Sequence, residues 1–405
     1  MIPKMNVYKE RWRIVSDDTI KPGLDAMQEA LIKVGNPEKK LQIIHVAGTN
    51  GKGSTIAFME AILKEHKLST GVFSSPAIID IHDQIRINGE AITEAELDKS
   101  FETMKEAGLS GLLTDFELLT VAAFVTFERL APDYVLLETG MGGLLDSTNV
   151  VIPLVSVITS IALDHTAFLG TTTAQVAKHK AGIIKKGIPT VIGTLPEEAL
   201  QVVRKISNRQ MSPLYIYGEQ FSMQDDVFNG IETFQLAGRR MRGPHQGMNA
   251  AVAIQSLLTT GIQLTEKGVS DAVASTQLAH RFQEISPDVF IDGAHNPAAA
   301  KVLAETIRTE FPGEKVDFVI GMLKGKDIER TLDELIPVAA SFTFLTFPNP
   351  QAATGEQLME YCNHKEKRVT MIGNDTIILA EGRDRKKIVA GSLYLLSSLI
   401  DYEIS

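Results

Sequence analysis

Short apolar runs alternate with amphipathic segments along most of the chain. In the first part the apolar runs are "LQIIHVAG", "DYVLLETG", "LVSVITSI" and "IPTVIGT", while "STIAFMEAILKEHKL" and "LLTVAAFVTFERLA" have apolar residues at helical spacing. Strands that alternate with helices are typical of parallel sheets covered on both faces, where ligands bind at the carboxyl ends of strands. The pattern therefore predicts an α/β fold.

The same alternation starts again after "HRFQEISPD". "DVFIDGAHNPAAAKVLAETI" indicates a strand, a turn and a helix, "VDFVIGML" and "FTFLTF" are strand-like, and "KKIVAGSLYLLSSLI" closes the chain. A length of 405 residues is also large for one hydrophobic core. We predict a large domain with a mostly parallel sheet over residues 1–283, and a smaller Rossmann-like α/β domain over residues 284–405.

Composition and charge narrow the possible functions. The formal net charge of -10 argues against a protein that neutralises nucleic-acid phosphates. Cys362 is the single cysteine, which excludes an intrachain disulfide and a two-cysteine metal site. The N-terminus has no apolar leader segment, and the most apolar stretch, "VVIPLVSVITSIAL", is interrupted by Pro153 and too short to span a membrane. We expect a cytoplasmic enzyme with neither nucleic acid nor membrane as a partner.

The turn after the first predicted strand, "HVAGTNGKGST", combines glycines with a cation. Gly48 stands three residues before Gly51, so the turn lacks the standard P-loop spacing G-x-x-x-x-G-K-[ST]. It could be an ordinary Gly-rich turn with Ser54 as helix N-cap. The flanking strand and helix favour phosphate binding, because glycines let backbone N–H groups converge on oxygen atoms and Lys52 adds positive charge. We expect Ser54 to open the helix and the first domain to be of the P-loop ATPase type.

Ten motifs along the chain resemble, in order, those of the folylpolyglutamate synthase and dihydrofolate synthase family, ATP-dependent ligases related to the Mur ligases. In that family the compact spacing of the phosphate loop is the normal form. The resemblance implies a central-type Mur ligase domain followed by a C-terminal Mur ligase-type domain. The motifs are "GLDAMQEALIKVGNPEKKLQIIHVAGTNGKGST", "SSPAIIDIHDQIRING", "LLETGMGGLLDSTNV", "SIALDHTAFLG", "VAKHKAGIIKKG", "PHQGMNAAVAIQ", "HRFQ", "IDGAHNPAAA", "GMLKGKDIERTL" and "AGSLYLL".

The resemblance also implies a set of site residues, two Mg²⁺ ions and a modified lysine. A lysine amine beside Mg²⁺ would repel the metal, and the family implies that Lys180 is carbamylated to an anionic ligand. The implied metal ligands are Ser75, Glu138, His165 and carbamylated Lys180, and the implied catalytic residues are Lys52, Glu138, His165 and Lys180. The implied ATP-binding residues are Thr49, Asn50, Gly51, Lys52, Gly53, Ser54, Thr55, Asn249, Arg281, Asp292 and His295.

The residues alone leave structural alternatives open for several of these positions. Asp164 could orient the His165 ring or cap the next turn. The alternatives are turn chemistry for Ser75, a cap on the glycine loop for Glu138, a structural histidine for His165, a solvated helix charge for Lys180, a linker charge for Arg281 and a strand-end cap for Asp292.

The activity that the resemblance implies is the joining of L-glutamate to a folate through an acyl phosphate, with dihydropteroate as a second acceptor. Ala77 and Leu144 depart from the family pattern, and "FPNPQAATGEQL" lacks an arginine that is often found there. These departures bear on the acceptor and the amino acid. The alternatives are a Mur-type ligase with another acid or amino acid, and a nucleotide-binding regulator without ligase activity. We expect a monomer that binds ATP, glutamate and folate or dihydropteroate.

Overall fold

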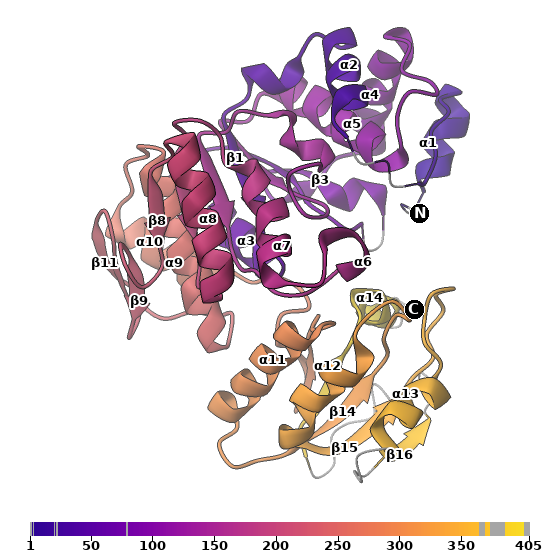
Figure 1. The fold of residues 1–405 in the computed structure, drawn as a ribbon, viewed down its shortest axis with the longest axis vertical. Coiled ribbons are helices and arrows are strands. Elements are labelled where there is room, and N and C mark those ends of the chain that lie inside the picture. Colours follow the sequence, from indigo (N-terminus) through magenta and orange to yellow (C-terminus); the bar gives the residue numbers. More distant parts are fainter. Residues whose placement is uncertain are drawn as a thin grey trace. The chain divides into compact units, whose positions relative to one another are not determined.

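The structure, a computed structural model, describes residues 2, 4–19, 21, 23–77, 80–363, 369–372 and 385–400, which form two compact units (Figure 1). The first unit comprises residues 1–238 and 248–276, and the second comprises residues 239–247 and 277–405. The boundary predicted between residues 283 and 284 lies somewhat beyond this division. Both units contain a sheet covered by helices, so the predicted α/β class is confirmed.

The first unit is built on an eight-stranded sheet in which β2, β5, β1, β6, β7 and β8 run parallel. Its edge strands β3 and β4 are antiparallel, and a separate three-stranded antiparallel sheet follows it in the chain. In spatial order the large sheet is β4 (Glu90–Ala91), β3 (Ile85–Ile87), β2 (Thr70–Phe73), β5 (Tyr134–Glu138), β1 (Ile43–Ala47), β6 (Val155–Ile158), β7 (Thr190–Ile192) and β8 (Leu214–Ile216), and the small sheet is β11 (Thr233–Gln235), β10 (Val227–Asn229) and β9 (Ser222–Gln224).

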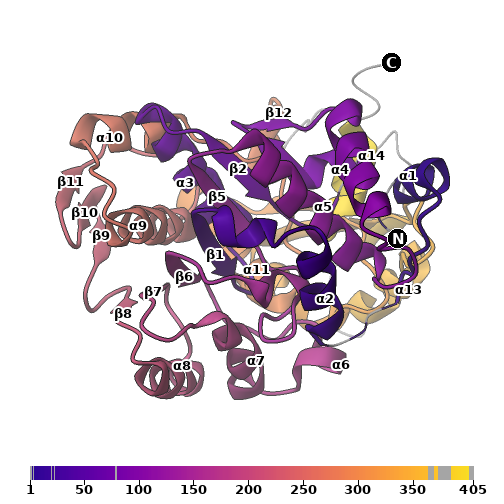
Figure 2. The ribbon, with the colours of Figure 1, turned by 90° about the horizontal axis from the view of Figure 1, so that it is seen from above.

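Helices cover both faces of the large sheet. Figure 2 shows α3, α9 and α10 on one side and α7 and α8 on the other. The helices are α1 (Met5–Trp12), α2 (Asp25–Lys33), α3 (Lys52–Glu65), α4 (Glu94–Glu106), α5 (Asp115–Leu130), α6 (Thr166–Leu169), α7 (Thr173–Lys180), α8 (Glu197–Gln210), α9 (Pro244–Thr259) and α10 (Glu266–Ser275), with 3-10 turns η1 (Pro37–Lys40), η2 (Ile81–Gln84), η3 (Ser147–Val150) and η4 (Ala181–Ile183).

The second unit has a six-stranded sheet in which the strands from β13 to β16 run parallel and β12 is antiparallel. In spatial order it is β12 (Gln283–Ser286), β13 (Val289–Ile291), β17 (Lys387–Ala390), β14 (Val316–Ile320), β15 (Ala339–Phe344) and β16 (Val369–Ile372). Its helices are α11 (Pro297–Glu310), α12 (Ile328–Leu335), η5 (Ile336–Val338), α13 (Gly355–Asn363) and α14 (Leu393–Ile400).

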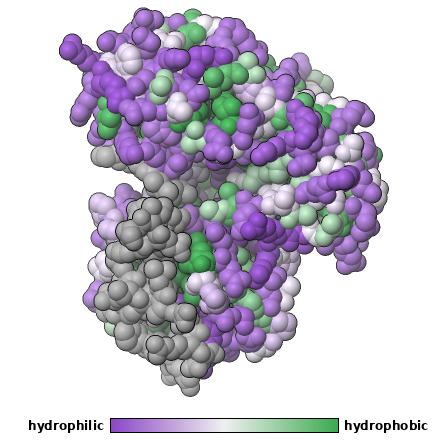
Figure 3. Space-filling view, turned by 180° about the vertical axis from the view of Figure 1, so that it is seen from behind, coloured by the Kyte–Doolittle hydropathy of each residue, from purple (hydrophilic) through white to green (hydrophobic). Residues whose placement is uncertain are grey.

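The surface of the described chain is largely polar. On the face in Figure 3, hydrophilic side chains predominate and apolar residues occur in small groups. Among the described residues, every helix is too short or too polar to cross a membrane.

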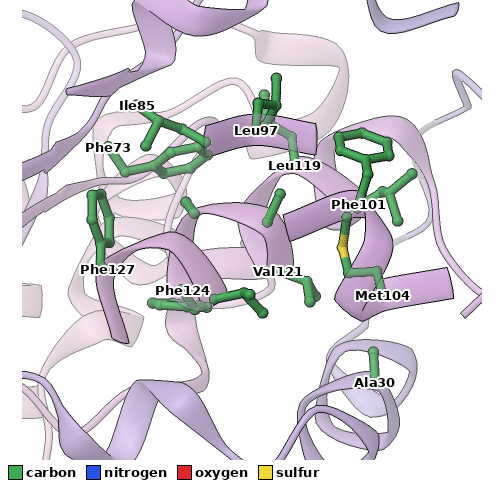
Figure 4. Packing of buried hydrophobic residues seen from close by; sticks show 14 of the residues in the cluster. Ala30, Phe73, Ile85, Leu97, Phe101, Met104, Leu119, Val121, Phe124 and Phe127 are labelled. Atoms are coloured by element: carbon green, nitrogen blue, oxygen red, sulfur yellow. The ribbon is translucent and has the colours of Figure 1, made fainter. Parts of the chain in front are cut away.

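A large apolar core of the first unit lies between α4, α5 and one end of the sheet. Figure 4 shows Phe101 from α4 and Phe124 and Phe127 from α5, packed in one cluster with Phe73 and Ile85. Both helices begin with a capping box, in which a threonine side chain and a glutamate three positions later satisfy each other's backbone N–H groups. The burial of these aromatic side chains holds α4 and α5 against β2 and β3, next to the strand ends that carry the candidate site.

His45 makes the stability of the first unit sensitive to acid. It is fully buried on β1, and burial lowers its pKa from 6.5 to about 3. The unfolded chain therefore takes up a proton below about pH 6.5 that the folded chain refuses. We expect His45 to reduce the free energy of unfolding by about 2 kcal/mol between about pH 7 and about pH 5. Urea unfolding at both pH values measures this loss, and it should shrink by that amount in the His45→Gln variant.

Candidate functional site

The candidate phosphate loop joins β1 to α3 at the carboxyl end of the sheet. Gly51 is the N-cap of α3 with a φ of 87°, a conformation that favours glycine. The helix begins at Lys52, so the prediction that Ser54 opens it is wrong; Gly53 and Ser54 lie in its first turn. No side chain caps this helix end, and its first N–H groups have no partners within the helix, which favours an anion there.

Glycine at position 48 is required by a close neighbour. A Cβ built on Gly48 would lie 1.9 Å from Thr159 Oγ1, which follows β6. The same hydroxyl donates to the Asn50 carbonyl at 2.7 Å. Thr49 is fixed beside it, because its Oγ1 accepts from Ala162 N at 3.0 Å. The loop therefore rests on the segment after β6, with little freedom to move.

We expect Gly48→Ala to displace the loop, because the new methyl group and the Thr159 hydroxyl cannot occupy the same space. Overpacking of this kind costs about 1–3 kcal/mol of stability. ATP affinity, measured by titration calorimetry, should fall at least about tenfold, which corresponds to ~1.4 kcal/mol. The matched control is Gly325→Ala, where the added Cβ has no neighbour within 4 Å and affinity should not change. Unchanged affinity in Gly48→Ala would contradict the role given to this loop.

Asn249 on α9 lies against the other side of the loop. Its Oδ1 would be 2.7 Å from a Cβ at Gly51, so asparagine and glycine fit together closely. Ser54 and Thr55 are buried, and Thr55 Oγ1 has no hydrogen-bond partner among the described residues. The structure thus brings Asn249, one of the implied ATP-binding residues, to the candidate phosphate loop.

Lys52, Glu138 and Ser75 come together at the ends of three strands. Glu138 is the last residue of β5 and is 5% exposed. Lys52 Nζ lies 3.6 Å from Glu138 Oε1 and donates to the Gly48 carbonyl at 3.1 Å. Ser75 follows β2, and its backbone N–H points to Glu138 Oε2 at 3.4 Å. A cation and a carboxylate therefore lie together beside the amino end of α3.

Lys180 ends α7 and is 4% exposed, so the alternative of a solvated helix charge is wrong. Burial, together with the charge of Lys52, lowers its pKa from 10.5 to about 7, against the opposing charges of Asp164 and Asp146. His165 is exposed, in a left-handed conformation at the start of α6. Its backbone N–H donates to Asp164 Oδ1 at 2.8 Å. Asp164 lies close enough to Lys180 for its charge to act on the Lys180 amine.

The remaining candidates belong to the second unit. Asp292 follows β13, and its partly buried carboxylate accepts from Phe282 N and Ala294 N at 2.9 Å each. It is therefore a strand-end cap, whatever else it binds. Burial raises the pKa of Asp292, while Arg281 opposes that shift. His295 Nδ1 donates to the Gly293 carbonyl at 2.8 Å. Asp292 is thus within the electrostatic influence of both Arg281 and His295.

Three positions that depart from the family pattern lie in different surroundings. Ala77 is buried, and Leu144 is 38% exposed with its N–H donated to the His179 carbonyl at 2.7 Å. The segment "FPNPQAATGEQL" runs from the end of β15 into α13. Leu144 is therefore the departure that lies beside the helix of Lys180.

Sequence comparisons place the chain among known ligases. The family model described as "Mur ligase middle domain" matches residues 46–257, and "Dihydrofolate synthetase, C-terminal domain" matches residues 276–402. A dihydrofolate synthase/folylpolyglutamate synthase from Bacillus subtilis is 34% identical over 412 aligned positions, covering 94% of each chain. The chain belongs to the folylpolyglutamate synthase and dihydrofolate synthase family of ligases. The family and the fold class predicted from the ten motifs are confirmed.

Solved structures of family members match nearly the whole chain. E. coli FolC in complex with DHPP and ADP has a TM-score of 0.89 at 30% identity, with 99% of this chain and 98% of that chain covered. A bifunctional folylpolyglutamate synthase/dihydrofolate synthase with Mn, AMPPNP and L-glutamate bound has a TM-score of 0.87 at 29% identity, with the same coverage. These relatives bind adenine nucleotides together with small-molecule substrates or a divalent metal.

The oxygen ligands that this chain offers fit a divalent cation that is bound partly by the protein and partly by nucleotide phosphates. Among the described residues, no cluster of three or more His, Cys, Asp and Glu side chains could hold a metal alone. Mg²⁺ is typically bound by one or two carboxylates plus phosphate oxygens and water. Glu138 and the hydroxyl of the adjoining Ser75 are hard oxygen donors of this kind. Lys180 as a plain amine does not fit, and would need to become an oxygen ligand.

Sequence reasoning missed His45 and Thr148, and gave Asp146 no role. Asp146 and Thr148 lie in the quoted motif "LLETGMGGLLDSTNV", and His45 lies in "IIHVAG". The one available signal was a polar residue in the middle of an apolar strand.

Proposed function

We propose that the protein joins L-glutamate to the γ-carboxyl group of a folate with ATP, and that it also makes dihydrofolate from dihydropteroate. The observation that supports this most directly is the convergence of Lys52, Glu138 and Ser75 beside the uncapped end of α3, in a chain of this family. The bound ligands of the solved relatives are of the same classes. The monomeric state remains a prediction.

The chemistry has two steps. The acceptor carboxylate attacks the γ-phosphorus of ATP, giving an acyl phosphate and ADP. The glutamate amine then attacks the acyl carbon, phosphate leaves, and the amine loses a proton as the amide forms. Positioning and charge neutralisation govern the first step, because the transferred group carries dispersed negative charge.

The residues of the loop meet these demands. The N–H groups at the start of α3 and the Lys52 ammonium would bind the phosphates, and the close packing of Gly48 against Thr159 would keep the loop in place. Mg²⁺, when bound, would neutralise phosphate oxygens, with Glu138 and Ser75 as its protein ligands. Asn249 would hold the nucleotide from α9. The ATP-binding roles of Arg281, Asp292 and His295, which lie in the second unit, stay predictions.

We further propose that Lys180 is carbamylated and serves, with His165, a second cation. Lys180 is buried at the end of α7, where a plain ammonium near Lys52 is unfavourable. Carbamylation joins the amine nitrogen to the carbon of CO₂ and releases one proton. It replaces a possible positive charge with an anion that carries two oxygen donors.

The test is a ligation assay with the purified protein, ATP, Mg²⁺ and L-glutamate. Tetrahydrofolate, dihydropteroate and a muramyl acceptor are supplied in separate reactions, and phosphate release and product mass are measured. We expect phosphate release that requires both glutamate and a pterin acceptor, with the product heavier by one glutamyl residue. Turnover with the muramyl acceptor alone would indicate another Mur-type ligase, and ATP hydrolysis independent of any acceptor would indicate a regulator.

A further inference from the structure

A buried chain of hydrogen bonds links strand β1 to the segment that follows Glu138. His45 Nε2 lies 2.9 Å from Thr148 Oγ1, and that hydroxyl donates to Asp146 Oδ1 at 2.5 Å. His45 and Thr148 are fully buried, and Asp146 is 6% exposed. Burial of each of these polar groups costs free energy, and the hydrogen bonds between them offset part of that cost.

The direction of the chain follows from its donors. Burial raises the pKa of Asp146, but hydrogen bonds from Thr148 and Met141 oppose that shift and favour the carboxylate. One of its oxygens receives Thr148 N and Thr148 Oγ1, and the other receives Met141 N at 2.8 Å, so Asp146 only accepts. The Thr148 hydroxyl has one proton, which goes to Asp146, so its lone pair accepts from His45 Nε2–H. His45 therefore carries a proton on Nε2, and burial, which lowers its pKa to about 3, keeps the ring neutral. His45 Nδ1 has no hydrogen-bond partner among the described residues. Because the proton is on Nε2, Nδ1 carries no N–H group that would be buried without an acceptor.

Asp146 fixes the glycine-rich segment 139–146 near its start, through the Met141 backbone N–H. The other end of this segment is attached to the helix of Lys180, since Leu144 N donates to the His179 carbonyl at 2.7 Å. Asn149 Nδ2 adds donors to the carbonyls of Leu144 and Gly182 at 3.0 and 3.1 Å. The segment thus spans the distance from Glu138 to the last turn of α7.

We propose that His45 is a positioning residue for the ligase: through Thr148 and Asp146 it holds segment 139–146, and with it the relative placement of Glu138 and Lys180. His45 touches no reacting group. The inference rests on the proposed ligase function, because it concerns the placement of residues that serve that reaction.

Hydrogen-bond geometry, rather than side-chain volume, explains the histidine at position 45. A leucine at position 45 would fill a similar buried volume among β5 and β6, yet it would leave the Thr148 hydroxyl without its donor. A glutamine has an amide N–H at a similar reach to the imidazole Nε2 and restores that donor. A role in packing alone would make leucine the milder change, whereas a role in positioning makes glutamine the milder one.

The test compares His45→Leu with His45→Gln, and Thr148→Val with Thr148→Ser, in the full chain. Steady-state kinetics give kcat and the KM for ATP, and thermal unfolding gives the stability of each variant. Misplacement of reacting groups by a small distance costs up to about 100-fold in rate, so we expect kcat to fall about 10–100-fold in His45→Leu and Thr148→Val. His45→Gln and Thr148→Ser should stay within about threefold of wild type, and the KM for ATP should change less than about twofold.

A second readout does not depend on turnover. Ring ¹⁵N chemical shifts of His45, assigned by difference from the His45→Gln spectrum, should show the neutral Nε2–H form throughout about pH 5–8. An Nδ1–H form would overturn the proposal, and so would equal kcat losses in His45→Leu and His45→Gln. An inactive wild-type protein would overturn the proposed function instead, while the ¹⁵N spectrum would still test the direction of the chain.

Discussion

Lys52→Met is expected to lower kcat about 10²–10³-fold, the usual effect of removing one preorganised group that stabilises developing charge. Methionine keeps the apolar stem of lysine but removes the ammonium that lies 3.6 Å from Glu138 Oε1 and donates to the Gly48 carbonyl. Without it, the γ-phosphate would face the Glu138 carboxylate with less neutralising charge. Glutamate-dependent phosphate release at saturating ATP measures the effect.

The matched control is Lys64→Met, because Lys64 lies on the same helix and its side chain is exposed. This change removes the same formal charge and should leave kcat within about twofold of wild type, since exposed charges are screened by salt. An equal loss in both variants would trace the effect to overall charge or helix stability. A Lys52→Met protein with full kcat would contradict the role of Lys52.

The strand, turn and helix around the loop could be predicted because each has a local signal. Apolar residues define β1, and the glycines mark the turn. The start of α3 was misplaced because the sequence rule assigns the N-cap to a hydroxyl side chain. Here Gly51, with positive φ, ends the turn and lets Lys52 enter the helix directly. A Cβ at Gly51 would also lie 2.7 Å from Asn249 Oδ1, so packing against a residue far along the chain favours glycine there as well.

The environment of Lys180 could not be predicted from the residues around it. Three basic residues end α7, and "KHK" has the composition of a solvated helix end. Long-range packing separates them: Lys180 is buried and Lys178 is exposed. The antiparallel edge formed by β3 and β4 was missed for a similar reason, because strands of two or three residues contain too little periodicity to be recognised.

The hydrogen-bond partners of His45 could not be predicted from the sequence either. A histidine in the apolar run "IIHVAG" indicates a buried polar group, but not its partner. Thr148 lies 103 residues further on, in a short turn whose place is set by the parallel packing of β5, β1 and β6. Ligand types at strand ends can be inferred from the chain, whereas the contacts that hold them in place depend on the tertiary fold.

Lys180→Ala is expected to lower kcat by at least about 10²-fold, because it removes both the buried nitrogen and any carbamate that forms on it. The carbamate makes a further prediction that separates it from a plain lysine. Wild-type protein held in buffer freed of CO₂ should lose activity, and added bicarbonate should restore it, while Lys180→Ala should respond to neither treatment. Protein labelled with ¹³C-bicarbonate should show a carbamate ¹³C signal that is absent in Lys180→Ala.

Lys178→Ala is the control, since Lys178 lies two residues earlier on α7 with an exposed side chain. It should keep both the rate and the bicarbonate response, because the exposed side chain of Lys178 lies outside the buried surroundings of Lys180. Full activity of wild-type protein without CO₂ would contradict carbamylation, but not the requirement for Lys180. Full activity of Lys180→Ala would remove Lys180 from the site. Lys180 is buried near the charge of Lys52, so its side chain and its modification are tested separately. The kcat of Lys180→Ala tests the side chain, and the response of wild-type protein to CO₂ tests the carbamate.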